Sequence, residues 1–278
     1  MTFRELIEKN TSLLKKLNRD DAAFSVKELV CSTFGVDRTW LIVNSEKNVD
    51  ENKLDEFLEK IKKLASGYPL QYLVGEWSFY GNDFIVGEGV LIPRPESEEL
   101  VDMVKSIYPP ESEFVLFDLC SGSGCIGISI AKIYPKAKIY LFEKSDDAIK
   151  YIEKNIALNG VENVVLLKWD IIKEPYTQVS PDIIISNPPY IKSDVISTLQ
   201  TEVHHEPLMA LDGGEDGLIF YRAIANLWLG LLNDGGFAAV EHGDEQGEDV
   251  SNIFKSVLRD VKVIKDIFGN TRFVSGKK

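Results

Sequence analysis

From about residue 95 onward, short apolar runs alternate with amphipathic stretches, and this alternation limits the fold more than any other feature. Strands that alternate with helices indicate an α/β fold with a mostly parallel, doubly wound sheet. The predicted strands cover residues 114–118, 138–142, 164–169, 181–186, 236–241, 261–266 and 271–274, and the predicted helices cover 96–107, 125–133, 146–159, 218–232 and 245–257.

The preceding part of the chain has a different pattern. Up to about residue 65, leucines recur at helical spacing, which predicts a small helical bundle with a loop over 44–52 and a helix over 26–34 capped by Ser25 or Asp20. Aromatic residues and glycines alternate over 69–93 and predict a β-hairpin. We therefore expect a helical domain over 1–68, a hairpin linker over 69–95 and an α/β domain over 96–278.

The formal net charge is −13, and it is unevenly distributed. Residues 1–75 hold 12 acidic and 12 basic side chains, whereas the remainder carries 32 acidic against 19 basic. A body of this charge repels a phosphate backbone, so direct nucleic-acid binding is not expected. The charge suits a protein partner with a basic surface, or it supports solubility alone.

Metal binding and membrane insertion find no support in the sequence. The three cysteines form no CxxC pair, and the three histidines do not supply metal-ligand spacing. Reduced thiols are typical of the cytosol. No signal core is present, and no apolar run approaches the roughly 20 residues that a membrane span needs. We expect a soluble cytoplasmic protein, by default a monomer.

A glycine-rich turn follows the first strand of the α/β part. Glycines there let the backbone approach a ligand closely, and the helix that follows favours an anionic group. Ligands of open α/β sheets bind at the carboxyl ends of the strands. The predicted cofactor residues in this turn are Asp118, Cys120, Ser121, Gly122, Ser123 and Gly124.

Acidic residues end the next two strands. Glu143 is placed to accept both hydroxyls of a ribose, and Asp170 is placed to accept from an adenine amine, with Ile171 beside it. The alternatives are a solvated strand end for Glu143 and a capping carboxylate for Asp170. A glycine turn with an acidic residue about 20 positions later suits a nicotinamide cofactor as well as S-adenosylmethionine.

The Asn-Pro-Pro-Tyr sequence at residues 187–190 decides between these cofactors. Pro188 and Pro189 restrict φ and remove two backbone donors, so the Pro188 carbonyl is held as an acceptor. The side-chain oxygen of Asn187 is a second acceptor, and Tyr190 offers an aromatic face for a planar group. Two such acceptors orient an amide or exocyclic amine for methyl transfer from S-adenosylmethionine, and Asn187 also borders the cofactor.

This chemistry needs no strong general base, because the nitrogen proton becomes acidic as the N–C bond forms. We therefore assign His204 and His205 to a loop and not to catalysis. An ordinary turn after a strand is the simpler alternative for residues 187–190, but the upstream glycine turn and Glu143 argue against it.

Other segments resemble the release factor glutamine N5-methyltransferases, the PrmC/HemK family. The resemblance rests on residues 69–75, 79–81 and 92–98, on Glu206-Pro207, Ala210-Leu211, Gly213-Gly214 and Asp216-Gly217-Leu218, and on Gly243, Gln246, Asp266, Gly269 and Arg272. It extends from about residue 65 to the C-terminus and implies a Rossmann-like methyltransferase sheet.

The resemblance implies a specific reaction and partner. Enzymes of this family methylate the glutamine of the Gly-Gly-Gln motif in peptide chain release factors, with S-adenosylhomocysteine as the second product. The N-terminal helical domain would help to recognise the release factor. Arg94 and Glu96 would bind substrate, although a surface ion pair between them is the simpler alternative.

The chain departs from the family pattern at several positions. Cys120 replaces a usual glycine, Glu143 a usual aspartate and Ser97 a usual threonine, while Ile171 follows Asp170 where an aromatic residue is common. Three other functions remain open: a methyltransferase acting on a ribosomal-protein glutamine, an adenine N6 nucleic-acid methyltransferase, and a non-catalytic cofactor-binding assembly factor. The acidic charge argues against the second, and the intact residues 187–190 argue against the third.

Overall fold

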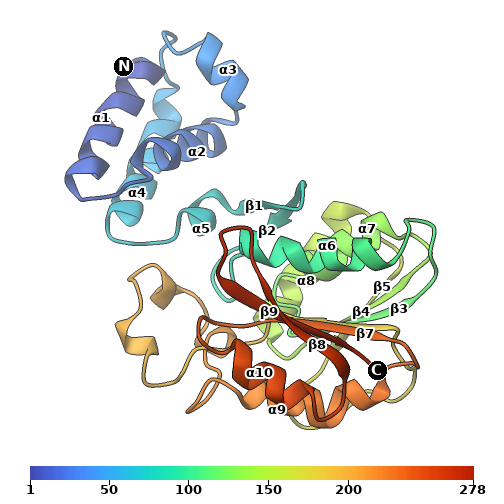
Figure 1. Ribbon diagram of the computed structural model, residues 1–278. Helices are drawn as coiled ribbons and strands as arrows, with labels where there is room; N and C mark the ends of the chain where they lie inside the picture. The colour runs from blue at the N-terminus through green and yellow to red at the C-terminus, as the bar shows by residue number, and fades with distance from the viewer. The chain divides into compact units, whose positions relative to one another are not determined.

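The computed structural model describes all 278 residues and divides into two compact units. The first comprises Met1–Glu76 with Gln200–His205, and the second comprises Trp77–Leu199 with Glu206–Lys278 (Figure 1). This division assigns the predicted 69–95 segment partly to each unit, so that its short helix belongs to the first and most of its hairpin to the second. None of the helices combines the length and the apolar character that crossing a membrane requires.

The first unit is a helical bundle. Its helices are α1 (Phe3–Lys16), α2 (Ala22–Phe34), α3 (Arg38–Val43), α4 (Glu51–Ala65) and α5 (Leu70–Val74). Leu6, Leu29 and Phe57 are fully buried between them, as the helical spacing of the apolar residues predicts. The capping prediction for α2 was wrong, because Asp21 is the N-cap, while Ser25 lies inside the helix and donates to the Asp21 carboxylate at 2.6 Å.

Residues 200–205 belong to this unit although they lie far along the chain. Glu202 forms an ion pair with Arg19 at 2.9 Å, and the His205 ring lies 4.9 Å from the Tyr68 ring. His205 is thus a packing residue of the first unit, and nothing in these contacts gives it a catalytic position.

The second unit carries the predicted doubly wound sheet. A separate hairpin of β1 (Glu76–Phe79) and β2 (Asn82–Ile85) precedes it. The seven-stranded sheet has the order β5-β4-β3-β6-β7-β9-β8. Its strands are β3 (Val115–Leu119), β4 (Lys138–Glu143), β5 (Val164–Lys168), β6 (Ile183–Ser186), β7 (Phe237–Glu241), β8 (Arg259–Lys265) and β9 (Thr271–Lys277). Strands β5, β4, β3, β6 and β7 are parallel, and β9 pairs antiparallel to both of its neighbours. The chain order reverses between β3 and β6, which is where ligands bind such sheets.

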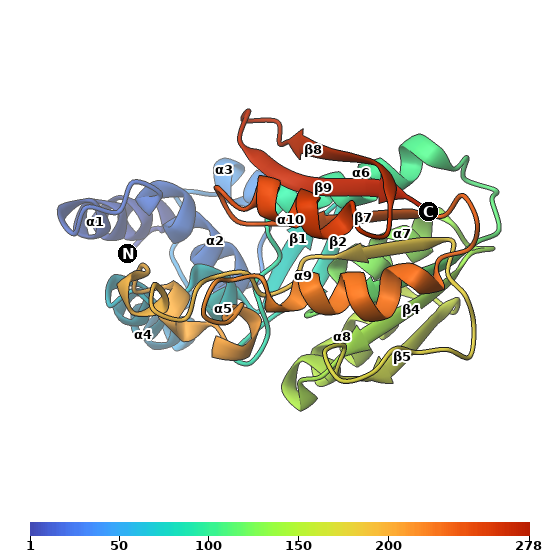
Figure 2. The same cartoon turned by 60° about the horizontal axis from the view of Figure 1, so that its bottom comes forward.

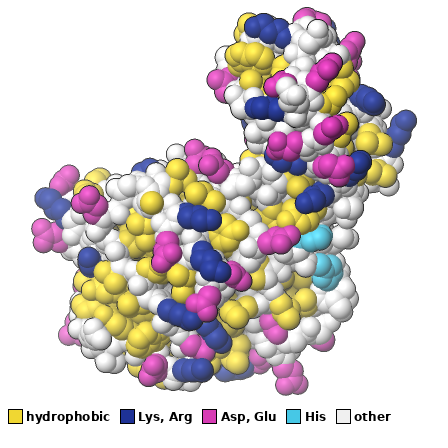
Figure 3. Space-filling model, turned by 180° about the vertical axis from the view of Figure 1, so that it is seen from behind, with side chains coloured by type: hydrophobic (Ala, Val, Ile, Leu, Met, Phe, Trp, Pro, Cys, Tyr) yellow, Lys and Arg dark blue, Asp and Glu magenta, His cyan; other side chains and the backbone are white.

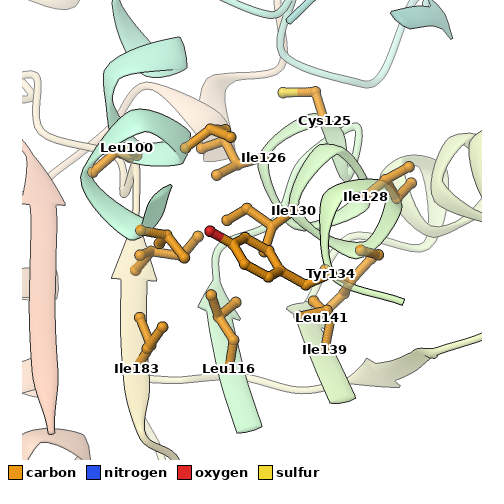
Figure 4. Close-up of a cluster of buried hydrophobic side chains, with 14 of the residues drawn as sticks. Leu100, Leu116, Cys125, Ile126, Ile128, Ile130, Tyr134, Ile139, Leu141 and Ile183 are labelled. Carbon is orange, nitrogen blue, oxygen red and sulfur yellow. The ribbon is translucent and has the colours of Figure 1, made fainter. Parts of the chain in front are cut away.

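Helices cover both faces of the sheet. Figure 1 shows α6 (Glu98–Ile107), α7 (Cys125–Ile133) and α8 (Asp146–Asn159) on one face, and Figure 2 brings forward the other, with α9 (Ile219–Ala223) and α10 (Gly247–Phe254). In the first layer, Ile126 and Ile130 of α7 and Tyr134, the residue after this helix, belong to one buried cluster with Leu116 and Ile183 of the sheet (Figure 4). These buried residues explain why the strands are continuous apolar runs.

Two predicted helices differ in detail. The helix predicted over 96–107 begins with a 3-10 turn, η1 (Pro95–Ser97), because Pro95 supports a tight first turn. The helix predicted over 218–232 continues beyond α9 as a π-turn, η5 (Ile224–Trp228), and a 3-10 turn, η6 (Leu229–Leu231). The wide turn accompanies the buried Trp228, whose indole N–H donates to the Ile171 carbonyl at 2.9 Å. Short 3-10 turns at Ile196–Thr198, Val203–His205 and Leu208–Ala210 were not predicted.

The surface drawn in Figure 3 carries acidic and basic side chains side by side. On this face the acidic excess of the chain does not gather into one continuous patch. A role of the charge in solubility and a charge-driven partner interaction both stay predictions.

Candidate active site

A pocket lies at the carboxyl ends of the parallel strands. Its wall includes the loop after β3, the end of β4, the loop after β5 and the loop after β6. The lining residues are Gly89, Val90, Leu91, Cys120, Gly122, Phe142, Glu143, Lys144, Ser145, Ala148, Trp169, Asp170, Ile171, Ile172, Asn187, Pro189, Pro207, Met209, Ala210 and Phe220. The pocket therefore sits at the reversal point of the sheet, as the sequence predicts.

The glycine turn is open toward this pocket. Gly122 has φ +57°, and a Cβ atom built on it would meet nothing within 4 Å. Its backbone N–H donates to Glu143 Oε2 at 2.8 Å, which ties the turn to the neighbouring strand β4. Gly124 also has a positive φ, +79°, and leads directly into α7. The bare backbone at Gly122 leaves room for a ligand to lie against it.

Glu143 is held by the backbone on three sides. Besides Gly122, its carboxylate accepts the N–H groups of Lys144 at 2.8 Å and Ser145 at 2.7 Å, both through Oε1. Burial raises the pKa of this carboxyl, while the three backbone hydrogen bonds act in the opposite direction. A carboxylate has about four acceptor positions, so Oε2 keeps the free position for a ligand hydroxyl.

Asp170 lines the pocket near Glu143, because it follows β5, the strand that pairs with β4. Its Oδ2 forms an ion pair with Lys144 at 3.0 Å, and its Oδ1 accepts the Ile172 N–H at 3.3 Å. Burial raises the pKa of this carboxyl, but the hydrogen bonds from Lys144 and Ile172 outweigh it and hold the pKa below its usual value. Asp170 is thus ionised at the pocket wall, next to Ile171 and Trp169.

Asp118 lies underneath the turn and not in the pocket wall. It is fully buried, and its Oδ2 accepts the Gly127 N–H at 3.0 Å while its Oδ1 has no hydrogen-bond partner. Burial raises the pKa of this carboxyl to about 8, with a further rise from the nearby Glu143. Ser121 and Ser123 are also buried outside the wall, and Ser121 Oγ donates to the Asp118 carbonyl at 2.8 Å.

The ten predicted cofactor residues thus fall into two groups. Six line the pocket: Cys120, Gly122, Glu143, Asp170, Ile171 and Asn187. Four shape the turn from below or behind: Asp118, Ser121, Ser123 and Gly124. The apolar wall formed by Leu91, Phe142, Met209 and Phe220 was not predicted, because apolar residues of a pocket carry no sequence signal that separates them from core residues.

Cys120 adopts a backbone conformation that glycine favours. Its φ is +60°, in the left-handed region, where a Cβ atom costs about 1 kcal/mol or more. This explains physically why a glycine suits the position. The Cys120 residue forms part of the pocket wall, and burial raises the pKa of its thiol well above the usual value.

Asn187 is connected to two residues behind it. Its Nδ2 donates to Ser97 Oγ at 2.9 Å, and Ser97 Oγ donates to Glu241 Oε2 at 2.5 Å. Ser97 and Glu241 are both buried. Neither was predicted as a site residue; the available signal for Glu241 was its place as an acidic residue at the end of an apolar strand.

The rest of the predicted acceptor motif surrounds Asn187. Pro189 lines the pocket, whereas Pro188 is buried beside it. Tyr190 lies outside the pocket wall, with its ring against Gly243 and its carbonyl oxygen accepting from Gln246 Nε2 at 3.0 Å. Burial and the nearby Glu241 raise the pKa of Tyr190. The stacking role of Tyr190 therefore stays a prediction.

Arg94 pairs with Glu206 and not with Glu96, the partner expected if the two residues formed a surface ion pair. Its Nη2 lies 2.5 Å from Glu206 Oε1, and the buried Glu206 carboxylate also accepts the Ile92 N–H at 3.2 Å. The Arg94–Glu96 ion pair is therefore not formed. Glu206 ties the segment before α6 to the loop that supplies Pro207, Met209 and Ala210 to the pocket wall.

Comparisons with known proteins agree with this geometry. Residues 5–75 match the model of the PrmC N-terminal domain, and residues 98–214 match that of the methyltransferase small domain. A release factor glutamine methyltransferase of Thermodesulfovibrio yellowstonii is 39% identical over 251 residues, covering 88% of this chain and 89% of the relative. One of Clostridium botulinum is 33% identical over 282 residues and covers 100% of both chains. A crystal structure of a methyltransferase from Pyrococcus furiosus has a TM-score of 0.54 at 18% identity, covering 82% of this chain and 99% of that chain, which supports the fold.

The doubly wound sheet, the pocket at its carboxyl edge and the matched methyltransferase domain define the class: this is a methyltransferase. The relatives define the family more narrowly, since they match almost the whole chain at 33–39% identity. The chain belongs to the release factor glutamine methyltransferase family.

Proposed function

We propose that this chain transfers a methyl group from S-adenosylmethionine to the N5 side-chain nitrogen of the glutamine in the Gly-Gly-Gln motif of peptide chain release factors. The observation that carries the proposal is the placement of Asn187. Its amide nitrogen is engaged by Ser97, so its side-chain oxygen remains as an acceptor in a residue that also lines the pocket. The family membership supplies the substrate class.

The pocket residues fit S-adenosylmethionine, which when bound supplies an electrophilic methyl group on a sulfonium. The free position on Glu143 Oε2 suits a ribose hydroxyl, and the ionised Asp170 suits an adenine amine. The open backbone at Gly122 suits close approach of the cofactor, and Cys120 adds a side chain where the turn meets the pocket. Asp118, Ser121, Ser123 and Gly124 support these contacts by shaping the turn.

Asn187 and Pro188 orient the substrate nitrogen. The Asn187 oxygen and the Pro188 carbonyl each accept one N–H of the glutamine amide, and they stabilise positive charge that develops on nitrogen. The N–C bond forms as the S–C bond breaks. The nitrogen then loses a proton to solvent, which leaves N5-methylglutamine and S-adenosylhomocysteine. Positioning supplies the remaining rate enhancement, so no basic side chain is required.

The partner is a peptide chain release factor, and the first unit contributes to its recognition. In this proposal Arg94 and Glu96 lie on the substrate side, with Arg94 oriented by Glu206. Tyr190 packs behind the acceptor and Pro189 closes the pocket beside it. A translation factor as substrate places the reaction in the cytoplasm, and the enzyme acts as a monomer.

The test is transfer of labelled methyl from S-adenosylmethionine to purified release factor. Three acceptors are compared: the wild-type factor, the factor with Gln-to-Ala in its Gly-Gly-Gln motif, and a DNA duplex. Label on the wild-type factor alone is the expected result. Label on DNA, equal label on the Gln-to-Ala factor, or label on none of them would refute the substrate assignment and leave the fold unaffected.

A further inference from the structure

We propose that Ser97 and Glu241 are positioning residues that set the orientation of the Asn187 side-chain amide. This inference rests on the proposed function, in which the Asn187 oxygen accepts from the substrate amide. Neither residue needs to touch the substrate or the cofactor for this role. They act through Asn187, which is the only one of the three that lines the pocket.

Three distant segments bring these residues together. Ser97 ends the 3-10 turn η1, Glu241 ends strand β7, and Asn187 follows strand β6. Their hydrogen bonds join Asn187 Nδ2 to Ser97 Oγ at 2.9 Å and Ser97 Oγ to Glu241 Oε2 at 2.5 Å. Ser97 and Glu241 are each only 2% exposed, so water does not compete for these bonds.

The chemistry of Glu241 dictates the direction of the chain of hydrogen bonds. An ionised carboxylate only accepts, so the single hydroxyl proton of Ser97 must point toward Glu241. The Ser97 oxygen is then left as an acceptor, and it can be satisfied only by the NH₂ group of Asn187. The Asn187 carbonyl oxygen must therefore face away from Ser97. A flipped amide would set two acceptor oxygens, those of Asn187 and Ser97, against each other.

The orientation matters because a flipped Asn187 would be inactive. Its NH₂ group would meet the N–H groups of the substrate amide, donor against donor. The carboxylate of Glu241 thus influences the substrate site across two hydrogen bonds. The Ser97 hydroxyl transmits this influence, and a threonine at the same position would keep the hydroxyl.

Protonation of Glu241 removes the constraint on the orientation of the Asn187 side-chain amide. A neutral carboxyl group can donate to Ser97, whose hydroxyl proton is then free to point at Asn187 and favour the flipped amide. Burial raises the pKa of Glu241 to about 7, against the hydrogen bond from Ser97 and the charge of Arg272. The charged or titratable groups that face Glu241 are Arg94 and Glu96 from the segment before α6, Arg272 from β9, Tyr190 from the acceptor loop, Tyr221 from α9 and Cys125 from α7.

The methylation rate should rise with pH through the pKa of Glu241. Glu241 is ionised above its pKa, so the active amide orientation is favoured as the pH rises through about 7 and is lost as the pH falls. The methylation rate of the wild-type enzyme should therefore have an acid limb in this range. A purely structural role of Glu241 would not produce a limb that disappears in the neutral variant.

The kinetic test compares Ser97→Ala, Ser97→Thr and Glu241→Gln with a matched control, Ser129→Ala. Ser129 is fully buried in α7 and its hydroxyl has no partner, so it reports the effect of removing a buried hydroxyl elsewhere. We expect Ser97→Ala to lower kcat about tenfold or more with KM for release factor nearly unchanged, as for loss of one preorganised contact. Ser97→Thr and Ser129→Ala should stay within about threefold of wild type, and Glu241→Gln should lose the acid limb.

A second readout needs neither substrate nor turnover. The side-chain amide of Asn187 is identified in a ¹⁵N spectrum by its absence in Asn187→Ala. In wild type its resonance should shift between pH 6 and 8, and in Ser97→Ala and Glu241→Gln this shift should vanish. Calorimetry should show S-adenosylmethionine affinity within about threefold of wild type in all variants except Asn187→Ala.

The two readouts separate the inference from the proposed function. If the Asn187 resonance ignores pH in wild type, or if Ser97→Ala has the same kcat as Ser129→Ala, the positioning role is refuted. If the resonance behaves as expected but wild-type enzyme does not methylate release factor, the positioning role of Ser97 and Glu241 stands and the substrate assignment fails.

Discussion

Replacing Asp118 by Asn should flatten the pH dependence of folding stability. Asp118 is fully buried, its Oδ1 has no hydrogen-bond partner, and its pKa is raised from 3.8 to about 8, chiefly by burial. The folded protein therefore keeps this proton at pH values where the unfolded chain has lost it. Stability is greatest below the ordinary pKa and declines as the pH rises, until Asp118 ionises in the folded state as well.

The size of the decline in unfolding free energy is set by the one proton that Asp118 binds in the folded state. At pH 6 the folded state binds about one proton more at this site than the unfolded state, and at pH 8, where Asp118 is half ionised, about half a proton more. A full proton costs about 1.4 kcal/mol per pH unit, so the decline over the interval is about 2.3 kcal/mol. Asparagine keeps an acceptor for the Gly127 N–H and places an uncharged NH₂ where Oδ1 lies. Its own unmade hydrogen bond costs about 1–3 kcal/mol at every pH and so does not change the slope.

The assay is urea denaturation of both proteins at pH 6, 7 and 8 without cofactor. Glu143 and Glu241 also have raised pKa values and contribute to the slope of both proteins, so the difference between the two slopes isolates Asp118. We expect the unfolding free energy of wild type to fall by about 2.3 kcal/mol more than that of Asp118→Asn between pH 6 and pH 8. Parallel curves within about 0.5 kcal/mol would refute the buried-carboxyl argument.

Three further substitutions test the site and its support. Asn187→Ala should lower the rate of methyl transfer by about a hundredfold or more, because it removes an acceptor for the substrate amide. The pocket remains, so S-adenosylmethionine affinity measured by calorimetry should stay within about tenfold of wild type. Equal loss of transfer and affinity would show that the residue is structural. Glu143→Ala should weaken S-adenosylmethionine binding before it affects transfer at saturation, and an unchanged affinity would contradict the ribose assignment. Gly127→Ala should destabilise by about 1–3 kcal/mol in thermal or urea unfolding, because its Cβ would collide with Leu141 Cδ2 and lie 2.9 Å from the Asp118 carboxylate. Gly230→Ala, where a Cβ meets nothing within 4 Å, is the control and should be neutral.

The order of helices and strands was available from local sequence. The helices α7 and α8 begin and end as predicted, and the parallel strands lie within two residues of their predicted bounds. Both depend on periodic apolar residues and on local signals such as Ser145, whose hydroxyl caps α8. The fold class followed from this alternation, and the family followed from short motifs.

Short elements were less predictable. The helices α3 and α5 and the 3-10 turns of residues 191–211 have too few residues to show a helical period. Their conformation depends on what they pack against. Residues 200–205 illustrate this, since Glu202 and His205 are held by Arg19 and Tyr68, more than 130 positions earlier in the chain.

Local sequence was enough to predict that a glycine turn, two acidic strand ends and an Asn-Pro-Pro-Tyr turn would meet at one edge of a sheet. This follows because parallel strands share the edge at which they end. Which of these residues face the pocket and which lie beneath it depends on how the helices pack against the sheet. Asp118 and Cys120 are two positions apart, yet one is buried under α7 and the other lines the pocket. The partners of Asn187 likewise depend on the tertiary structure, because Ser97 and Glu241 meet it through the packing of η1 and β7, and local sequence carries no information about side-chain contacts across such distances.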